Sequence, residues 1–179
     1  MDLFQAIERR RSVRAYKEGA VDEEDLNRIL EAGILAPSAG NIQPWEFIIT
    51  KKSVVKTGLA EAASQQTFIT EAPVVITVCA KEDDSAARYG DRGRRLYSIQ
   101  DTAAAIENML LAATALGYGT CWIGAFDEAM VKNVLRIAPK VRPVAIIPVG
   151  LPKGSNPPAV PRKHLTKVIH SEFYAEHAT

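Results

Sequence analysis

The spacing of apolar positions along the chain predicts helices that alternate with strands. Apolar residues recur at intervals of three and four residues in five segments, which is typical of amphipathic helices. These segments are a short one after Asp2, one between Asp22 and Pro37, residues 53–66, residues 98–117 and one after Asp127. Four segments rich in β-branched and aromatic residues are predicted to be strands: residues 45–50, 73–80, 120–126 and 143–152. This alternation, without an internal repeat, indicates a layered domain with one sheet between helices.

Individual residues indicate where several of these elements begin or end and how they are buried. The helix predicted over residues 98–117 carries one apolar stripe and is expected to end at Gly117. The strand predicted over residues 73–80 is continuously apolar, so we expect it to be buried on both faces. Three aspartates precede helical patterns, and each is expected to cap a helix N-terminus: Asp2, Asp22 and Asp127.

Two segments are not predicted to form a helix or a central strand. Residues 81–97 are highly charged and contain two glycines, so they are expected to form an exposed loop or lid. Residues 153–163 hold too many prolines for a helix or a central strand and are expected to run extended over a surface.

The length and the amino-acid composition favour one ordinary globular domain over residues 1–179. Lys and Arg number 22, Asp and Glu number 21, and the net charge of +1 favours neither nucleic acid nor an acidic membrane as a partner. No apolar run approaches the ~20 residues of a membrane span, and the N-terminus has no apolar signal core. The two cysteines, Cys79 and Cys121, sit in apolar runs and are expected to be reduced core residues of a cytoplasmic protein.

The search for common catalytic groups excludes several classes. His164, His170 and His177 do not have the helical spacing of metal ligands, so they are interpreted as exposed tail residues and no metal site is expected. A hydrolase is disfavoured because the chain has no GxSxG motif, and no histidine lies in the first 160 residues to serve as the base for a nucleophile such as Ser38.

The small residues near position 120 do not form a dinucleotide-binding fingerprint. In GYGTCWIG the third glycine position of such a fingerprint is occupied by Trp122, and the stretch follows a helix and enters a strand, which is the reverse order. Gly117 and Gly119 are better interpreted as a helix stop and a tight turn. Gly124 and Ala125, at a strand end, would let a planar ligand approach the backbone closely.

Two polar clusters are candidate binding groups. ERRRSVRAY groups four arginines around Ser12, and forked guanidiniums with a hydroxyl suit a phosphate monoester. On a continuing helix Arg10 and Arg14 would share a face; the alternative is a solvated basic helix end. PSAGNIQPW offers hydroxyl and amide groups that suit a heterocycle or a sugar, whereas taken alone it is equally typical of a turn.

Five motifs occur in the order typical of nitroreductase-like flavoproteins. They are RRRSVRAY, APSAGNIQPWEF, ALGYGTCWIGAF, VGLP and PRKHLTKVI, and they span about residues 3–169. The chain therefore resembles the nitroreductase-like family of FMN-dependent oxidoreductases. The resemblance implies an α+β fold with a central, largely antiparallel sheet flanked by helices, and an intertwined homodimer in which residues 153–179 wrap around the partner subunit. The residues alone leave a parallel sheet equally open.

The resemblance also implies which residues bind FMN. The phosphate and ribityl chain would be held by Arg10, Arg11, Ser12 and Arg14, joined by Arg162 with Lys163 from the C-terminal tail. A loop lying against the flavin bound mainly by the partner subunit would consist of Pro37, Ser38, Ala39, Asn41 and Gln43. The strand end beside the flavin ring, where a backbone N–H can face N5, would be Ile123, Gly124 and Ala125. No catalytic side chain is implied, because the flavin carries the chemistry.

The implied activity is reduction of electron-poor acceptors, such as nitroaromatics, quinones or activated alkenes, by NAD(P)H through flavin N5 with ping-pong kinetics. In the segment 81–97, Arg92, Arg95 and Tyr97 are candidate substrate-binding residues, with Arg88, Arg94 and Tyr89 beside them; the alternative is a solvated charged loop. The resemblance also permits other flavin chemistry, namely oxygen-dependent flavin breakdown or reductive dehalogenation. A non-enzymatic nucleic-acid binder is the remaining alternative, and it predicts binding that weakens steeply with salt.

Overall fold

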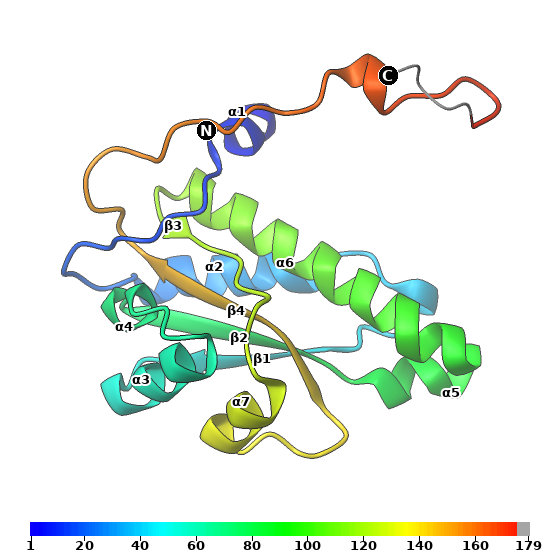
Figure 1. Ribbon diagram of the computed structural model, residues 1–179, viewed down its shortest axis with the longest axis horizontal. Coiled ribbons are helices and arrows are strands. Elements are labelled where there is room, and N and C mark those ends of the chain that lie inside the picture. The colour runs from blue at the N-terminus through cyan, green and yellow to red at the C-terminus, as the bar shows by residue number, and fades with distance from the viewer. Residues whose placement is uncertain (175–179) are drawn as a thin grey trace.

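A four-stranded sheet lies between two layers of helices (Figure 1). We describe residues 1–174 of a computed structural model. The strands are β1 (Trp45–Thr50), β2 (Val74–Ala80), β3 (Gly119–Thr120) and β4 (Arg142–Gly150), in the spatial order β1-β2-β4-β3. Neighbouring strands pair antiparallel throughout, so the α+β fold with an antiparallel sheet is confirmed.

One face of the sheet is covered by α2 (Glu23–Ile34) and α6 (Ser98–Ala115), which lie above it in Figure 1. Alternate residues of β2 point to this face, where Ile76 and Val78 pack with Ile106 and Leu110 of α6. The other face is covered by α3 (Ser53–Ala62), α4 (Phe68–Glu71) and α7 (Glu128–Leu135). Every residue of β2 is buried, as its continuous apolar run predicts.

The ends of the helices follow the predicted signals. The side chains of Asp2, Asp22 and Asp127 each accept backbone N–H groups at the start of α1 (Leu3–Arg9), α2 and α7. After α6, Gly117 adopts φ +89°, and the Tyr118 N–H donates to the Ala113 carbonyl at 2.8 Å. This pairing closes the helix as a glycine C-cap, so the predicted stop at Gly117 is confirmed.

Three predicted elements differ from the structure. Residues 81–97 are not a loop: α5 (Glu82–Arg92) leads into a π-helical turn, η2 (Gly93–Tyr97), which continues into α6. The strand predicted over 120–126 shrinks to β3 and one isolated bridge between Ile123 and Ile146. The helix predicted over 53–66 ends at Ala62, because Ser64 and Gln65 adopt left-handed φ values of 57° and 61°.

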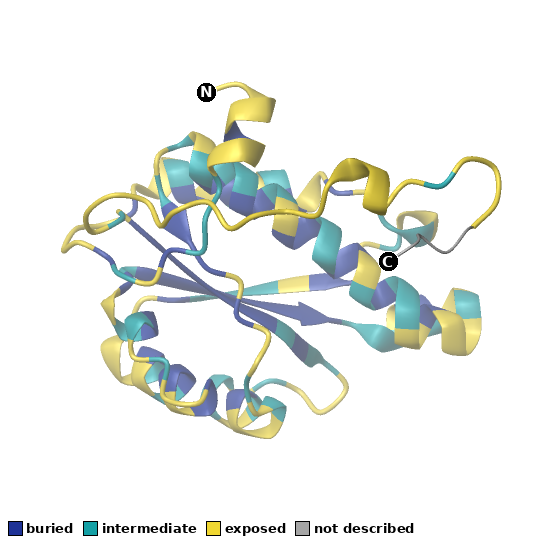
Figure 2. Ribbon diagram, turned by 45° about the horizontal axis from the view of Figure 1, so that its top comes forward, coloured by how far each residue is buried: buried dark blue, intermediate teal, exposed yellow. Residues whose placement is uncertain are grey.

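Helix α1 and the segment that follows β4 both lie on the upper side of Figure 1. After β4 the chain runs extended and almost wholly exposed to a short 3₁₀ turn, Leu165–Lys167 (Figure 2). This confirms the extended course predicted for residues 153–163. His177 lies outside the described residues. Within residues 1–174, no helix has the length and apolar character needed to cross a membrane.

Candidate functional site

The arginines predicted to bind phosphate meet in one cavity of about 480 Å³. Its lining includes Arg10, Arg11, Ser12 and Arg14 from the N-terminal segment and Arg162 from the C-terminal tail. Pro157, Pro158, Ala159 and Val160 complete the side that the tail contributes. Two segments about 150 residues apart in sequence thus bring four guanidinium groups to one cavity, whose wall also holds a hydroxyl. Such a set of donors suits a phosphate, whose oxygens accept several charge-assisted hydrogen bonds.

The backbone that carries these arginines is extended rather than helical. Helix α1 ends at Arg9, and Arg10 takes φ −55° and ψ 126°, so the idea that Arg10 and Arg14 share one helix face is wrong. Ser12 instead forms a bridge with Thr120, and the Val13 N–H donates to the Thr120 carbonyl at 2.8 Å. The arginine segment is therefore attached to the edge of the sheet at β3.

Neighbouring groups hold two of the arginine side chains. Arg11 Nη1 donates to the carbonyls of Glu8 and Arg10, at 2.5 and 2.9 Å. Arg10 Nε lies 3.8 Å from a carboxylate oxygen of Glu107 on α6. In the tail, Arg162 donates to the Val160 carbonyl at 3.0 Å, while Lys163 is exposed and does not line the cavity.

The polar loop predicted near the flavin is a compact turn that continues from α2 into β1. Residues Ala39–Asn41 form one 3₁₀ turn, and Ser38 Oγ accepts the Gln43 N–H at 3.0 Å. Gln43 Nε2 donates to Asn41 Oδ1 at 3.1 Å. Asn41 and Gln43 are exposed, so their amide groups remain accessible, whereas Ser38 and Ala39 are half-buried and Pro37 is exposed.

This loop does not line the arginine cavity. It attaches to the first turn of α6, where the Ala39 N–H donates to Asp101 Oδ1 at 3.0 Å. The arginine segment contacts α6 six residues further along, at Glu107. Within the described protomer, the arginines and the tail are thus brought together, and the loop is not.

The strand end predicted to face a flavin ring is held by the sheet. Ile123 is buried, and it exchanges two backbone hydrogen bonds of 3.0 Å with Ile146 of β4. Gly124 and Ala125 follow directly and are exposed. A Cβ atom placed on Gly124 would have no heavy atom within 4 Å, so the space beside this backbone is open.

The arm formed by α5 and η2 contacts the polar loop. Arg88 Nη1 donates to the Gly40 carbonyl at 3.2 Å, and a Cβ on Gly40 would lie 2.5 Å from Tyr89 Oη. Of the three predicted substrate-binding residues, Arg92 lies 5.4 Å from the Tyr97 ring centroid and donates from Nε to its hydroxyl at 3.0 Å. Arg95 pairs with Asp91 at 2.8 Å, which already compensates its charge.

Both cysteines are unsuited to nucleophilic chemistry. Cys79 and Cys121 are buried and free. Burial raises the pKa of Cys79 to about 12, and it also raises the pKa of Cys121, although Arg14 and Ser12 act in the opposite direction. Both groups are therefore protonated thiols at neutral pH. Within residues 1–174, no cluster of three or more His, Cys, Asp or Glu side chains has the geometry to hold a metal ion.

Asp101 is the site-adjacent residue that the sequence reasoning missed. It is 6% exposed, and its pKa is raised by burial, an effect that the hydrogen bond from Ala39 opposes. The sequence did contain a signal for this residue, because Asp101 shares a helix face with the buried Ala105 and Met109, at spacings of four and eight residues. An acidic residue on an apolar face is rarely buried without a partner.

Comparison with known proteins places the chain in a family. The nitroreductase family model matches residues 7–71 and 55–151. A putative NADH dehydrogenase/NAD(P)H nitroreductase of Archaeoglobus fulgidus is 35% identical over 156 residues, covering 85% of this chain and 86% of that protein. The 5,6-dimethylbenzimidazole synthase of Rhodospirillum rubrum is 28% identical over 173 residues, covering 83% of this chain and 81% of that protein. The crystal structure of a nitroreductase family protein from Clostridium novyi NT matches with a TM-score of 0.78 at 33% identity, over 86% of each chain. The chain is an oxidoreductase that belongs to the nitroreductase family.

Proposed function

We propose that this protein is a cytoplasmic, homodimeric, FMN-dependent NAD(P)H oxidoreductase that reduces electron-poor acceptors. The acceptors we expect are nitroaromatics, quinones or activated alkenes. The observation that carries the proposal is the cavity in which arginines from both ends of the chain meet. A phosphate monoester carries nearly two negative charges at neutral pH and needs several cations around it.

The residues present fit FMN at its phosphate end. Arg10, Arg11, Arg14 and Arg162 would supply the guanidinium groups, and Ser12 would supply a hydroxyl for the phosphate or ribityl oxygens. Lys163 follows Arg162 in the tail and would add a further positive charge close by. Because the arginine segment is fixed to Thr120 of β3, the phosphate site would lie at a defined distance from the strand end at Ile123.

The strand end fits the flavin ring. Gly124 and Ala125 are small and exposed, the space beside Gly124 is open, and the hydrogen bonds of Ile123 to β4 keep this backbone in place. A backbone N–H here would face N5 and orient the ring without any ionisable side chain. Bound FMN would supply the hydride-accepting and hydride-donating atom. NAD(P)H and the acceptor would bind in turn at the same place, which gives ping-pong kinetics.

Two further parts would complete the site. The loop Pro37, Ser38, Ala39, Asn41 and Gln43 would lie against the cofactor held mainly by the partner subunit. The helical arm at residues 82–97, which contacts this loop, would act as a lid and present Arg92 and Tyr97 to substrates. Arg95 would contribute only by giving up its pairing with Asp91.

A direct test is the absorbance spectrum of the purified protein, followed by FMN titration and anaerobic reduction with NADH and with NADPH. We expect a yellow protein or one that takes up FMN, bleaching by at least one nicotinamide, and recovery on adding a quinone. Arg14→Ala and Arg162→Ala should each weaken FMN binding about ten-fold or more, because each removes a hydrogen bond to a charged phosphate. Lys140→Ala removes an equal charge from an exposed turn outside the cavity and should leave FMN binding unchanged. A protein that takes up no FMN would exclude the proposal.

A second candidate is oxygen-dependent breakdown of the flavin. It is favoured by the similarity to the 5,6-dimethylbenzimidazole synthase. Incubation of the protein with reduced FMN and oxygen, without any other acceptor, would yield a benzimidazole product in this case. Under the main proposal, the same incubation returns intact FMN.

A further inference from the structure

The loop at residues 38–43 adopts a backbone that needs support. Gly40, Asn41 and Gln43 all lie in the left-handed region, with φ values of 58°, 56° and 55°. For residues with a side chain this region is disfavoured, and such conformations persist where the surroundings hold them. Two of the three residues are not glycine, so the contacts that keep this loop in shape matter more than in an ordinary turn.

The contacts come from two helices. The Ala39 N–H donates to Asp101 Oδ1 of α6 at 3.0 Å, and Arg88 of α5 donates to the Gly40 carbonyl at 3.2 Å. Arg88 is exposed, whereas Asp101 is 6% exposed. The bond to Asp101 joins a backbone donor to a carboxylate away from water, so it is the stronger of the two.

Asp101 is an unfavourable residue for the fold itself. Its second oxygen, Oδ2, is buried without a hydrogen-bond partner among residues 1–174. A buried carboxylate that is only half satisfied destabilises a protein. Nor does it gain from a helix N-terminus, because Tyr97 before α6 is already helical, with φ −65° and ψ −44°, and the π-helical turn precedes it.

We propose that Asp101 is a positioning residue for the cofactor site, which fixes the loop 38–43 through Ala39 at the expense of fold stability. It holds the 3₁₀ turn so that the exposed amides of Asn41 and Gln43 keep one orientation. That this orientation serves a flavin rests on the proposed function; the fixing of the loop does not.

The experiment compares Asp101→Leu, which fills similar space without an acceptor, with Asp101→Asn, which keeps an acceptor for Ala39. Thr102→Val is the control, because Thr102 is the next residue of α6, is also buried, and its side chain bonds only within the helix. Three quantities are measured on the full chain: the thermal midpoint, hydrogen exchange of the amides of residues 39–43 without cofactor, and the Kd for FMN.

For Asp101→Leu we expect an unchanged or higher thermal midpoint, faster exchange in the loop by about ten-fold or more, and a similar loss in FMN affinity. Asp101→Asn should restore both loop protection and affinity. Thr102→Val should alter neither. If the leucine variant does not fold, Asp101→Ala gives the same comparison without added bulk.

Unchanged loop exchange in the variants without an acceptor would overturn the proposal. A lower midpoint with faster exchange along the whole of α6 would also overturn it, since Asp101 would then be an ordinary structural residue. If the wild type binds no FMN but the loop exchange follows the expected pattern, the positioning role stands and the proposed function fails.

Discussion

At the residue scale, the arginine segment reaches the sheet only because residue 119 has no side chain. A Cβ on Gly119 would lie 2.8 to 2.9 Å from three side-chain atoms of Val13. Val13 itself is buried and its N–H donates to Thr120. The close approach of these two segments therefore sets where the neighbouring Arg11, Ser12 and Arg14 lie.

The variant Gly119→Ala should lower the free energy of unfolding by about 1–3 kcal/mol, because overpacking a buried contact forces backbone shifts. Urea unfolding of the cofactor-free protein measures this effect. Gly124→Ala is the control for stability, since its Cβ would meet open space, and it should change stability by no more than about 0.5 kcal/mol. Equal unfolding midpoints for the two variants would contradict the packing argument.

At the element scale, most boundaries could be predicted because apolar residues mark them. The strand 45–50 is confirmed to the residue, and the aspartate caps fix the starts of three helices. The arm at 82–97 could not be predicted in this way, because few of its residues are buried. Only Ser85 and Gly93 are buried there. Its charged residues pair on the surface, Arg94 with Asp83 and Arg95 with Asp91, so a sequence this charged, with two glycines, was interpreted as a loop.

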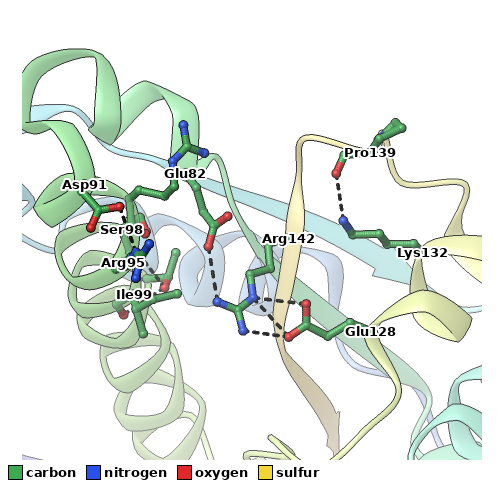
Figure 3. A network of polar contacts seen from close by, with 11 residues as sticks. Glu82, Asp91, Arg95, Ser98, Ile99, Glu128, Lys132, Pro139 and Arg142 are labelled. Atoms are coloured by element: carbon green, nitrogen blue, oxygen red, sulfur yellow. Dashed lines mark hydrogen bonds and ion pairs between the residues drawn. The ribbon is translucent and has the colours of Figure 1, made fainter.

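Arg142, the first residue of β4, connects the start of the arm to the start of α7 (Figure 3). It forms three hydrogen bonds of 2.8 to 3.1 Å with the Glu128 carboxylate. Its Nη1 also donates to Glu82 at 3.3 Å. Because Glu128 closely follows the turn at Gly124 and Ala125, this guanidinium links that turn with the base of the arm.

Replacing Arg142 with Gln should loosen both helix starts, and hydrogen exchange resolved by segment measures this. We expect the free energy of local opening to fall by about 1 kcal/mol in α5 and in α7, a modest value because the Arg142 side chain is 43% exposed. Glu82→Gln should affect only α5, and Glu128→Gln only α7. A change confined to β4 in all three variants would show that Arg142 does not connect these helices.

At the scale of the whole molecule, the sequence indicated which segments carry the site better than how they meet. The convergence of Arg10 to Arg14 with Arg162 was expected from the resemblance, and the cavity geometry agrees with it. The contacts between loop, arm and α6 could not be read from the sequence, because backbone groups of Ala39 and Gly40 make them. Backbone donors and acceptors are the same for every residue type, so they leave no signature in the residue pattern.

The surface of the protomer supports the proposed homodimer. Its accessible area of 10699 Å² exceeds the roughly 8,500 Å² of a compact monomer of its mass. Large apolar side chains remain exposed on α1, namely Leu3, Phe4 and Ile7, and in the tail, namely Leu165, Val168, Ile169, Phe173 and Tyr174. The outer edge of β1 also has no strand beside it among the described residues. Exposed large apolar side chains and an open strand edge are features that an interface with a partner subunit would cover.

A truncation that ends at Lys163 tests this assembly while keeping Arg162. The full chain should elute with a mass of twice 19.5 kDa in light scattering coupled to size exclusion. The truncated chain loses the tail's exposed apolar residues and should shift toward the monomer. Because the loop at residues 38–43 would then face no partner, the FMN affinity of the truncated chain should fall as well, although every arginine of the cavity remains.

A chain ending at Tyr174 is the matched control and should stay dimeric. If the chain ending at Lys163 keeps both the dimer mass and the full FMN affinity, the tail does not hold the two subunits together.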